Sequence, residues 1–290
     1  MICTLCPRNC GAVRTDSCSG GVCGMPAGPV LARAMLHQWE EPCLVGEHGA
    51  GAVFFSGCNL RCTYCQNKSI SQGGTGKPVS AARLRGIFQE LVAHGAACLD
   101  LVTPTHFIPA VLEALGEKSW PVPVVWNCGG YENVFTLQQL EHKVQVYLPD
   151  LKYALPGPAG KYSAAPDYFD YAAPAILEMF RQTGPYHMEN GLLKSGVLIR
   201  HLLLPGELEN TRHVIDWVSG TFRPGDVLFS LMSQYTPQPG AAGNLARHVT
   251  RAEYRAAVQY MENCGIMDGY TQERTSAREE YTPDFDLSGT

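Results

Sequence analysis

Residues 52–65 read Ala52-Val53-Phe54-Phe55-Ser56-Gly57-Cys58-Asn59-Leu60-Arg61-Cys62-Thr63-Tyr64-Cys65, a short apolar run followed by three cysteines. The apolar run predicts a buried β-strand. The cysteines follow in C-x3-C-x2-C spacing on what we expect to be one tight loop. Three such thiolates can hold three irons of a cubane cluster and leave the fourth iron for an outside ligand. A four-cysteine electron-transfer cluster or a zinc knuckle is the alternative, and either requires a fourth ligand at a matching spacing nearby.

Five more apolar runs of strand length lie farther along the chain. With residues 52–56 they predict six buried strands, the other five at 98–103, 122–127, 144–149, 197–204 and 226–232. Near-continuously apolar strands are typical of parallel sheets that helices cover on both faces. Helices are expected at 80–94, 108–115, 137–142, 173–182, 210–218 and 252–264, the first with Ser80 as its N-cap. The pattern predicts an α/β protein and is compatible with an open doubly wound sheet or a partial barrel.

The composition excludes several classes of protein. The chain has 290 residues, of which 45% are hydrophobic and 17% charged, so it is neither disordered nor fibrous. Its net charge of -5 argues against a nucleic-acid partner. No apolar run approaches the roughly 20 residues that span a bilayer, and the first residues lack the pattern of a secretory signal. We therefore expect a cytoplasmic protein without a membrane partner.

The first 25 residues contain a second group of cysteines, in a stretch rich in Gly, Ser and Pro that cannot build a core of its own. Its members are Cys3, Cys6, Cys10, Cys18 and Cys23. A cytoplasmic chain of this length does not need disulfides, so metal ligation is the favoured interpretation. We expect structural zinc or a second iron–sulfur cluster, bound by Cys3, Cys6, Cys10 and Cys23. Cys18 is then a spare or displaces one of them, and free cysteines packed on the main domain are the alternative.

The C-x3-C-x-aromatic-C run after a strand resembles the signature of the radical S-adenosylmethionine (SAM) superfamily. The resemblance implies that Cys58, Cys62 and Cys65 bind a 4Fe-4S cluster whose fourth iron chelates SAM, and that Tyr64 borders the adenine. It also implies a domain like three quarters of a TIM barrel, with cluster and SAM at the carboxyl edge of the strands.

The expected fold is therefore α/β, a partial TIM barrel (β/α)6 of radical SAM type with a small N-terminal cysteine-rich, metal-binding extension. We expect the extension at 1–45, the barrel at 46–273 and a C-terminal tail at 274–290 that wraps over the barrel.

Polar residues at the carboxyl ends of the strands are the candidates for cofactor binding. The second strand ends in Thr103-Pro104-Thr105-His106, where many radical SAM enzymes have a Gly-Gly-Glu stretch that receives the SAM amino group. We expect Thr103, Thr105 or His106 to take that role. His106 could equally be a helix N-terminal residue without a chemical role.

Two further strands end in residues that could face a cofactor. Asn127 and Gly129 follow the third strand, where a glycine lets the backbone approach a ligand closely. Gln234 closes the sixth strand, where a contact with adenine or substrate and a plain turn are both compatible with the sequence. We expect all three residues to contribute to cofactor binding.

The fourth and fifth strands supply charges. Asp150 and Lys152 alternate after the fourth strand, which places an anion and a cation on one face, although a plain surface ion pair is the alternative. Arg200, if buried, needs an anionic partner, which is the SAM carboxylate or a neighbouring acid. These features resemble the activating enzymes of glycyl radical enzymes. The resemblance implies that Asp150 and Lys152 lie beside the methionine moiety of SAM.

Longer stretches resemble the group of radical SAM proteins named for pyruvate formate-lyase (glycyl radical enzyme) activation that have an N-terminal cysteine-rich segment. These stretches are Cys6-Pro7-Arg8-Asn9-Cys10, Leu36-His37-Gln38-Trp39-Glu40-Glu41-Pro42, Phe54-Phe55-Ser56-Gly57-Cys58, Thr103-Pro104-Thr105-His106 and Ala165-Pro166-Asp167-Tyr168. In one respect the chain departs from some activating enzymes. Their ferredoxin-type inserts follow the C-x3-C-x2-C motif, whereas the extra cysteines here precede it.

The resemblance implies a radical SAM enzyme, an oxidoreductase that reductively cleaves SAM at its 4Fe-4S cluster to a 5′-deoxyadenosyl radical for hydrogen abstraction. Its leading substrate is a glycyl radical enzyme, and an electron donor such as flavodoxin or ferredoxin is implied. Direct radical modification of a small molecule or peptide is the rival hypothesis. A non-catalytic iron–sulfur or zinc-binding module is the third, and it would leave the polar strand ends unexplained.

Overall fold

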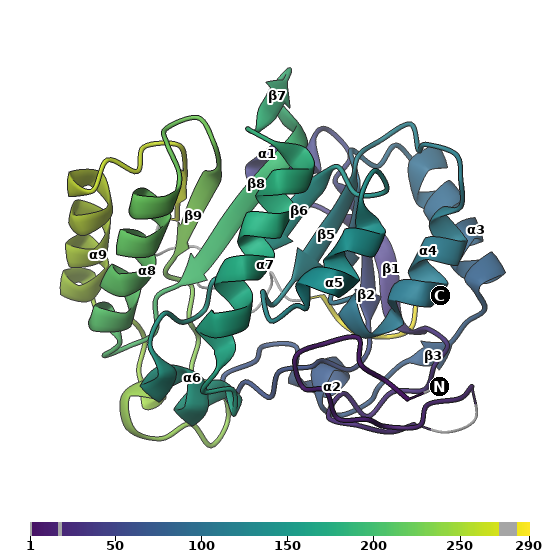
Figure 1. The fold of residues 1–290 in the computed structure, drawn as a ribbon, viewed down its shortest axis with the longest axis horizontal. Helices are drawn as coiled ribbons and strands as arrows, with labels where there is room; N and C mark the ends of the chain where they lie inside the picture. Colours follow the sequence, from purple (N-terminus) through teal and green to yellow (C-terminus); the bar gives the residue numbers. More distant parts are fainter. Residues whose placement is uncertain (1, 17–18, 273–282) are drawn as a thin grey trace.

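The computed structural model describes residues 2–16, 19–272 and 283–290. At its centre lies one sheet, which within these ranges has ten strands in the order β10-β9-β8-β6-β5-β4-β2-β1-β3, with β7 paired to β8 off this path (Figure 1). The mutually parallel strands are β2 (Ala50–Phe55), β4 (Leu99–Val102), β5 (Val124–Cys128), β6 (Val146–Pro149), β8 (Leu192–Leu202), β9 (Leu228–Met232) and β10 (Gly269–Thr271). The antiparallel strands are β1 (Val30–His37), β3 (Lys77–Pro78) and β7 (His187–Glu189).

The six strands predicted from the sequence are β2, β4, β5, β6, β8 and β9, and their parallel pairing is confirmed. Strand β2 is buried at every residue, which explains its uninterrupted apolar sequence. The three residues of β10 are too few to stand out from their surroundings. The α/β class is confirmed, and the partial TIM barrel stays a prediction.

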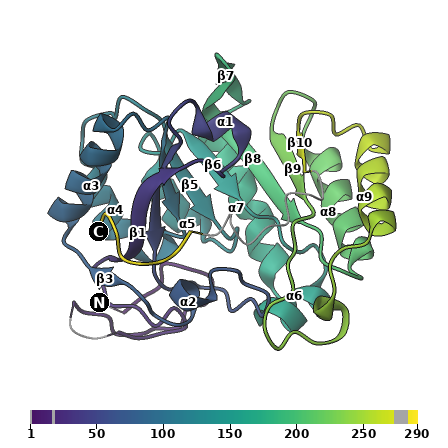
Figure 2. The same ribbon diagram turned by 180° about the vertical axis from the view of Figure 1, so that it is seen from behind.

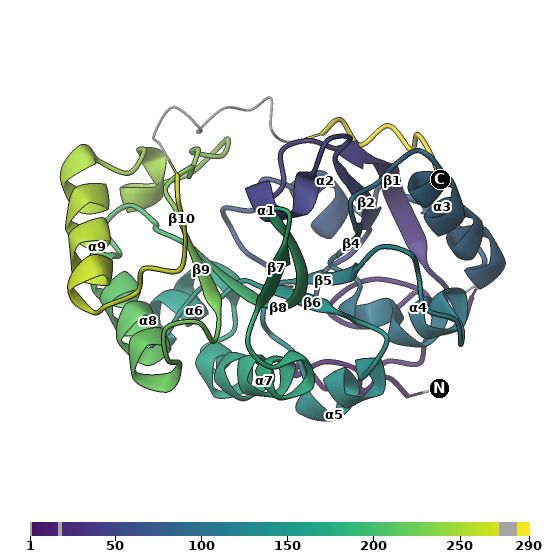
Figure 3. The ribbon, with the colours of Figure 1, turned by 90° about the horizontal axis from the view of Figure 1, so that it is seen from above.

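Helices cover the outer side of the curved sheet, where α4, α5, α7, α8 and α9 lie in a row (Figure 3). The helices are α1 (Pro42–Val45), α2 (Lys68–Ser71), α3 (Ala81–Ala93), α4 (Ile108–Leu115), α5 (Val134–Leu137), α6 (Pro156–Ser163), α7 (Tyr168–Thr183), α8 (Leu208–Thr221) and α9 (Arg251–Asn263). Short 3-10 helices lie at Thr105–Phe107, Gln138–Leu140 and Gly243–Ala246. Parallel strands joined by outer helices bring the carboxyl ends of β2, β4, β5, β6 and β8 to one edge of the sheet.

Helix α3 forms where its apolar residues recur at helical spacing. The Ser80 hydroxyl accepts a hydrogen bond from the backbone N–H of Arg83 at 3.1 Å, so the predicted N-cap is confirmed. Leu84, Ile87 and Phe88 on its inner face are fully buried. The predicted helix at 137–142 is wrong in its bounds. The chain forms α5 earlier and continues as a 3-10 turn that ends at Leu140.

Both ends of the described chain lie against the sheet. The N-terminal segment, drawn in purple, runs beside α2 at the lower edge of the molecule (Figures 1 and 2). It continues into β1, which pairs with β2. Of the predicted tail, residues 274–282 lie outside the described residues. Residues 283–290 follow β1, where Leu287 N–H donates to Ala32 O and Ser288 O accepts from Ala34 N–H.

Among the described residues, no helix combines the length and the apolar character that a membrane crossing requires.

Candidate active site

The cysteine loop begins directly after β2. Gly57 adopts a φ of +80°, a left-handed conformation that favours glycine. A side chain at this position would also meet Cys23 O at 2.9 Å, because the N-terminal segment packs directly on the turn. The loop therefore leaves the strand sharply, and its three cysteines follow at the carboxyl edge of the sheet.

The three sulfurs have few partners in the protein. The Ser163 hydroxyl donates to Cys62 Sγ at 2.9 Å, and Cys65 Sγ lies 3.3 Å from Ser71 Oγ. Burial raises the pKa of the Cys58 and Cys62 thiols, and each is raised further by neighbouring sulfurs of the loop. The Lys152 ammonium group lowers the pKa of both thiols. The loop thus places three thiols close together, and Lys152, from the segment after β6, is a nearby cation that favours the thiolate form.

The donor set fits an iron–sulfur cluster better than a single metal ion. In the part of the chain that the structure describes, no three His, Cys, Asp or Glu side chains are arranged around one ion site. Each cysteine of a cubane cluster binds a different iron, so the ligand sulfurs stand farther apart than around one ion. Three thiols from one loop, beside a buried cation, are the ligands that such a cluster requires.

Tyr64 is held in place beside the loop. The Tyr153 hydroxyl donates to Tyr64 Oη at 2.8 Å and lies 2.7 Å from Ser163 Oγ. The ring of Tyr64 also makes edge contacts with Tyr162 and Tyr235. This network connects the ligand loop to the segment after β6 and to α6. The contact of Tyr64 with adenine stays a prediction.

The structure brings four of the predicted strand-end residues together. Arg200 donates through Nε to Asp150 Oδ1 at 3.0 Å and through Nη2 to Asn127 Oδ1 at 2.7 Å. Lys152 Nζ lies 2.5 Å from Asp150 Oδ2. All four side chains are mostly buried, so the pair of Asp150 and Lys152 is not a plain surface ion pair. Arg200 forms its ion pairs with neighbouring acids in this structure, which favours a neighbouring acid over the SAM carboxylate as its anionic partner.

Two acids in the same group are missing from the sequence-based prediction. Glu40 accepts from Arg200 Nη1 at 2.9 Å and from Asn127 Nδ2 at 3.1 Å. Asp100 is fully buried in β4, and its Oδ2 accepts from Asn127 at 3.3 Å. A charge within an apolar strand could have indicated Asp100. Glu40 lies in one of the stretches that resemble the activating proteins, but no local pattern assigned it to this group, because it reaches the group from the connection between β1 and β2.

The acids in this group differ in protonation. Burial and the nearby Glu40 raise the pKa of Asp100 well above its ordinary value. Burial also raises that of Asp150, but Lys152 and Arg200 outweigh it, so the pKa of Asp150 is lowered. Two cations therefore stabilise Asp150 as an anion, whereas burial favours the neutral form of Asp100.

The three candidates after β4 lie apart from Arg200. Thr105 Oγ1 donates to Glu132 Oε1 at 2.6 Å, and His106 Nε2 lies 2.7 Å from Ser56 O. Both side chains are buried, and burial raises the pKa of Glu132 to about 8. Thr103 has a φ of +61°, which is rare for a β-branched residue and marks local strain. A role of these residues toward the SAM amino group stays a prediction.

The two remaining candidates lie close to other parts of the site. A side chain at Gly129 would meet Leu60 at 3.1 Å and Lys152 at 3.6 Å, so the backbone here approaches the cysteine loop closely. Gln234 lines a cavity of about 390 Å³ together with Glu40, Glu41 and Arg200. Both residues therefore lie beside the groups already described, and their contacts with a cofactor stay predictions.

The N-terminal segment is fixed to the cysteine loop by arginines. Arg8 donates to Asn59 O at 2.7 Å and to Ser163 O at 3.0 Å, and it also reaches Ala164 O. Arg14 is buried, and it donates to His106 O at 2.8 Å. These contacts join the segment to both the ligand loop and the turn after β4.

The N-terminal cysteines lie near one another. Burial raises the pKa of Cys6 and Cys23, and nearby thiols, including Cys3 for both, raise it further. Cys10 is exposed, and backbone N–H groups lower its pKa. Cys18 lies outside the described residues. Among the described residues, these four thiols are not arranged around one ion site, and the second metal stays a prediction.

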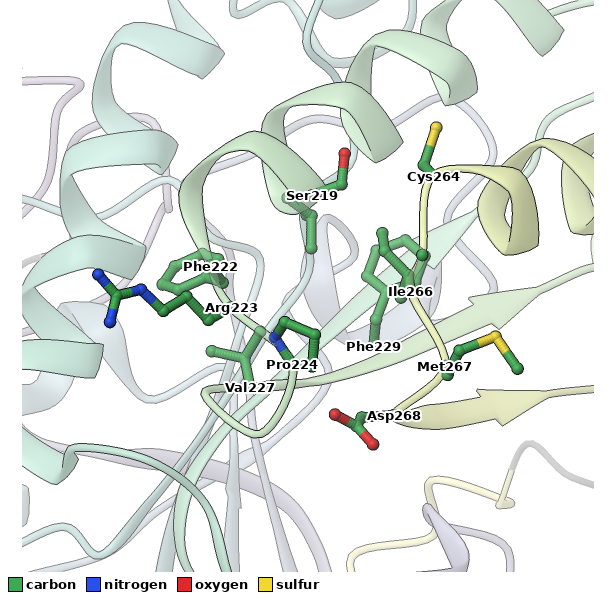
Figure 4. A pocket seen from close by; sticks show the side chains of 12 residues that line it. Ser219, Phe222, Arg223, Pro224, Val227, Phe229, Cys264, Ile266, Met267 and Asp268 are labelled. Carbon is green, nitrogen blue, oxygen red and sulfur yellow. The ribbon is translucent and has the colours of Figure 1, made fainter.

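A smaller cavity of about 150 Å³ lies elsewhere, at the amino end of β9 between α8 and α9 (Figure 4). Phe222, Val227, Phe229 and Ile266 form its apolar wall, and Cys264 and Asp268 lie at its rim. No residue of the cysteine loop or of the Arg200 group lines it. This cavity is therefore separate from the candidate active site.

Residues 45–151 match the 4Fe-4S single cluster domain family. This range contains the cysteine loop and strands β2 to β6. The uncharacterized protein MJ0674 of Methanocaldococcus jannaschii is 28% identical over 244 residues, which cover 80% of this chain and 66% of that protein. The chain thus spans slightly less than two thirds of that relative.

The fold is similar to that of SuiB from Streptococcus suis. The free SuiB structure gives a TM-score of 0.50 at 11% identity, covering 77% of this chain and 48% of SuiB. The complex with S-adenosylmethionine gives 0.50 at 11%, covering 79% and 52%. The complex with precursor peptide SuiA gives 0.51 at 10%, covering 75% and 47%. The chain spans about half the length of SuiB, and at this level of identity the likeness shows a shared fold.

Proposed function

We propose that this protein is a radical SAM enzyme whose 4Fe-4S cluster is held by Cys58, Cys62 and Cys65. The observation that carries the proposal is the arrangement of three thiols on the loop after β2, with Lys152 beside them. The 4Fe-4S single cluster domain match covers this loop, and the fold likeness to SuiB bound to S-adenosylmethionine supports the cofactor. When bound, the cluster would supply one electron to the sulfonium of SAM, which yields methionine and a 5′-deoxyadenosyl radical.

The residues of this chain would prepare the site for that chemistry. Lys152 and the Ser163 hydroxyl favour the thiolate form of Cys62, which is the form that binds iron. Tyr153 fixes Tyr64 against the loop through their hydroxyl groups. The N-terminal segment packs on Gly57 and is held by Arg8, so it covers one side of the loop and excludes water there.

For the substrate, we propose a glycyl radical enzyme, which this protein would activate by abstracting a backbone hydrogen. The contact of Asp150 with both Lys152 and Arg200 supports this choice, because these residues carry the resemblance to activating enzymes. An external one-electron donor such as flavodoxin or ferredoxin is required, and a cytoplasmic location agrees with such a donor.

A second candidate is direct radical modification of a peptide or small molecule. The fold likeness to SuiB bound to precursor peptide SuiA favours a peptide within this class. The two candidates differ in where the abstracted hydrogen comes from, and in whether the radical remains on the substrate.

Deuterium transfer tests both candidates. The reconstituted holoprotein is reduced anaerobically with SAM, and 5′-deoxyadenosine is measured without substrate. Deuterated candidate substrates are then added, and the deuterium in 5′-deoxyadenosine is measured by mass spectrometry. A glycyl radical enzyme labelled at its glycines should transfer deuterium and retain a radical signal. An absence of 5′-deoxyadenosine under all conditions would overturn the radical SAM assignment itself.

We also propose a second metal bound by Cys3, Cys6, Cys10 and Cys23. Cys3 raises the pKa of both Cys6 and Cys23, and Cys23 raises that of Cys6, which supports the proximity of these three thiols. A Gly-rich segment gains little free energy from apolar burial, whereas a tetrathiolate metal site supplies it directly. Elemental analysis with Mössbauer spectroscopy should show zinc or additional iron that is lost in Cys6→Ala. Four irons per chain, no zinc and no change in that variant would contradict the second metal.

A further inference from the structure

The cavity of about 390 Å³ beside Arg200 has no occupant in the proposed function. It lies between the connection from β1 to β2 and the strands β8, β9 and β10. Its wall includes the side chains of Trp39, Glu40, Glu41, Arg200 and Gln272. The wall therefore combines acidic, basic, amide and aromatic groups around a space large enough for a side chain or a small molecule.

The charges around this cavity do not balance. Arg200 forms ion pairs with Asp150 and Glu40, and Lys152 pairs with Asp150. Burial and the nearby Glu40 raise the pKa of Asp100, which favours its neutral form. No ion pair among the described residues includes Glu41, although only 5% of this residue is exposed. One carboxyl group, that of Glu41, thus remains at the cavity without a cation in contact.

Hydrogen-bond acceptors are also in excess. Gln272 Oε1 is buried and, within residues 2–16, 19–272 and 283–290, has no hydrogen-bond partner. Burial raises the pKa of Glu41 to about 7, and the Arg200 guanidinium and the Ser230 hydroxyl only partly offset this effect. An unpaired buried acceptor costs free energy that a ligand with N–H donors would recover. An unpaired acceptor, Gln272 Oε1, and a buried carboxyl group without an ion pair, that of Glu41, thus lie on one wall and point to a ligand rich in donors.

We propose that this cavity binds a positively charged amine or guanidinium group of the substrate, with Glu41 as its ion-pair partner and Gln272 as a second acceptor. The proposal rests on the proposed function, since it assigns recognition of that enzyme's substrate to the inner side of the sheet. It adds the same requirement, a positive charge, to both candidate substrates. The segment presented to the enzyme carries a lysine or arginine, or a small molecule carries an amine.

Binding of simple probes to the holoprotein tests the inference without radical chemistry. Isothermal titration calorimetry compares Nα-acetyl-lysine amide and Nα-acetyl-arginine amide with the neutral Nα-acetyl-norleucine amide. We expect a cationic probe to bind about tenfold more tightly than the neutral one, as one buried charge-assisted hydrogen bond provides. Glu41→Gln should abolish this preference. Glu47→Gln changes an exposed glutamate of the same connection between β1 and β2 and should preserve it.

Three outcomes would overturn the inference. They are equal binding of charged and neutral probes, a preference that survives Glu41→Gln, and mutual exclusion of the cationic probe and SAM, which would make the cavity a SAM subsite. If Glu41→Gln does not fold, Gln272→Leu should weaken the cationic probe severalfold, and unchanged binding would count against the proposal.

The parallel measurement of 5′-deoxyadenosine separates the two proposals. Protein that cleaves SAM but binds the probes equally contradicts only the cation site. Protein that prefers the cation but never cleaves SAM contradicts the radical SAM function, and leaves a cation-binding cavity of a different enzyme.

Discussion

The cysteine loop and the Arg200 group both lie at polar positions of the same sheet, but they hold their side chains in different ways. In the loop, the backbone and two arginines fix the position of three sulfurs that have little to bind within the protein. In the Arg200 group, Arg200 and Lys152 form ion pairs with Asp150 and Glu40, so these side chains hold one another in place. The difference indicates that the sulfurs of the loop are available to a ligand, whereas the ion pairs of the charged group fix the positions of its own side chains.

Removal of one loop thiol should give the largest effect. Cys62→Ala leaves two anchors for the cluster, so reductive cleavage of SAM should fall to background, as measured by 5′-deoxyadenosine formation. Cys264→Ala removes a thiol at the rim of the separate cavity and should retain the wild-type rate. Normal product formation by Cys62→Ala would show that the loop is not the cluster site.

Removal of the central cation should give the next largest effect, on stability. Arg200→Ala leaves Asp150 and Glu40 without their shared partner, so the free energy of unfolding should drop by about 3–5 kcal/mol. Arg200→Lys keeps the charge without the planar fork and should lose less. Urea unfolding measures both variants. A loss of unfolding free energy below about 1 kcal/mol in Arg200→Ala would contradict the role of Arg200 as the shared partner of both acids. SAM affinity should follow the same order.

Acid should weaken the stabilising contribution of His201, a buried histidine next to the charged group. His201 is buried between Leu151 O, at 2.6 Å, and Thr211 Oγ1, at 2.9 Å, and burial lowers its pKa to about 4. The unfolded chain binds the proton near pH 6.5, so the contribution of His201 to stability should fall as the pH drops from about 6.5 to about 4. The loss attributable to His201 is about 3 kcal/mol.

Urea unfolding at several pH values checks this dependence. His201→Gln should lack this contribution, so its free energy of unfolding relative to the wild type should rise as the pH drops from 6.5 to 4, whereas the contribution of His106, whose pKa burial also lowers to about 4, is common to both proteins. His213→Gln changes an exposed histidine and should keep the full dependence. An unchanged slope in His201→Gln would refute the assignment.

The smallest effect is expected where the N-terminal segment is fastened to the loop. Arg8→Ala removes hydrogen bonds to three backbone carbonyls, so the segment should open more readily by about 1–2 kcal/mol. Hydrogen exchange of residues 2–16 measures this opening. Arg61→Ala removes only the contact with Val22 O and should change exchange less. Equal exchange in Arg8→Ala and the wild type would mean that packing alone holds the segment.

The strands and helices whose positions depend on short stretches of sequence could be predicted. The six parallel strands follow from uninterrupted apolar runs, and α3 follows from its cap and periodic leucines. Asp150, Lys152 and Arg200 could be grouped because parallel strands end at one edge. Glu40 could not, since its contact with Arg200 joins positions 160 residues apart through an antiparallel strand that has no distinct sequence pattern. The bounds of α5 also depend on packing against α7, which no local pattern encodes.

The last eight residues have a consequence for the behaviour of the whole molecule in solution. Strand β1 pairs with β2 along one side, but on its other side β3 pairs only with Val30 and Leu31. The backbone of Leu287 and Ser288 occupies the next hydrogen-bonding positions, at Ala32 and Ala34. An open strand edge is a template for pairing with another chain. The C-terminal residues thus cover the free edge of β1. We expect a chain cut before residue 283 to expose this edge and to self-associate through it.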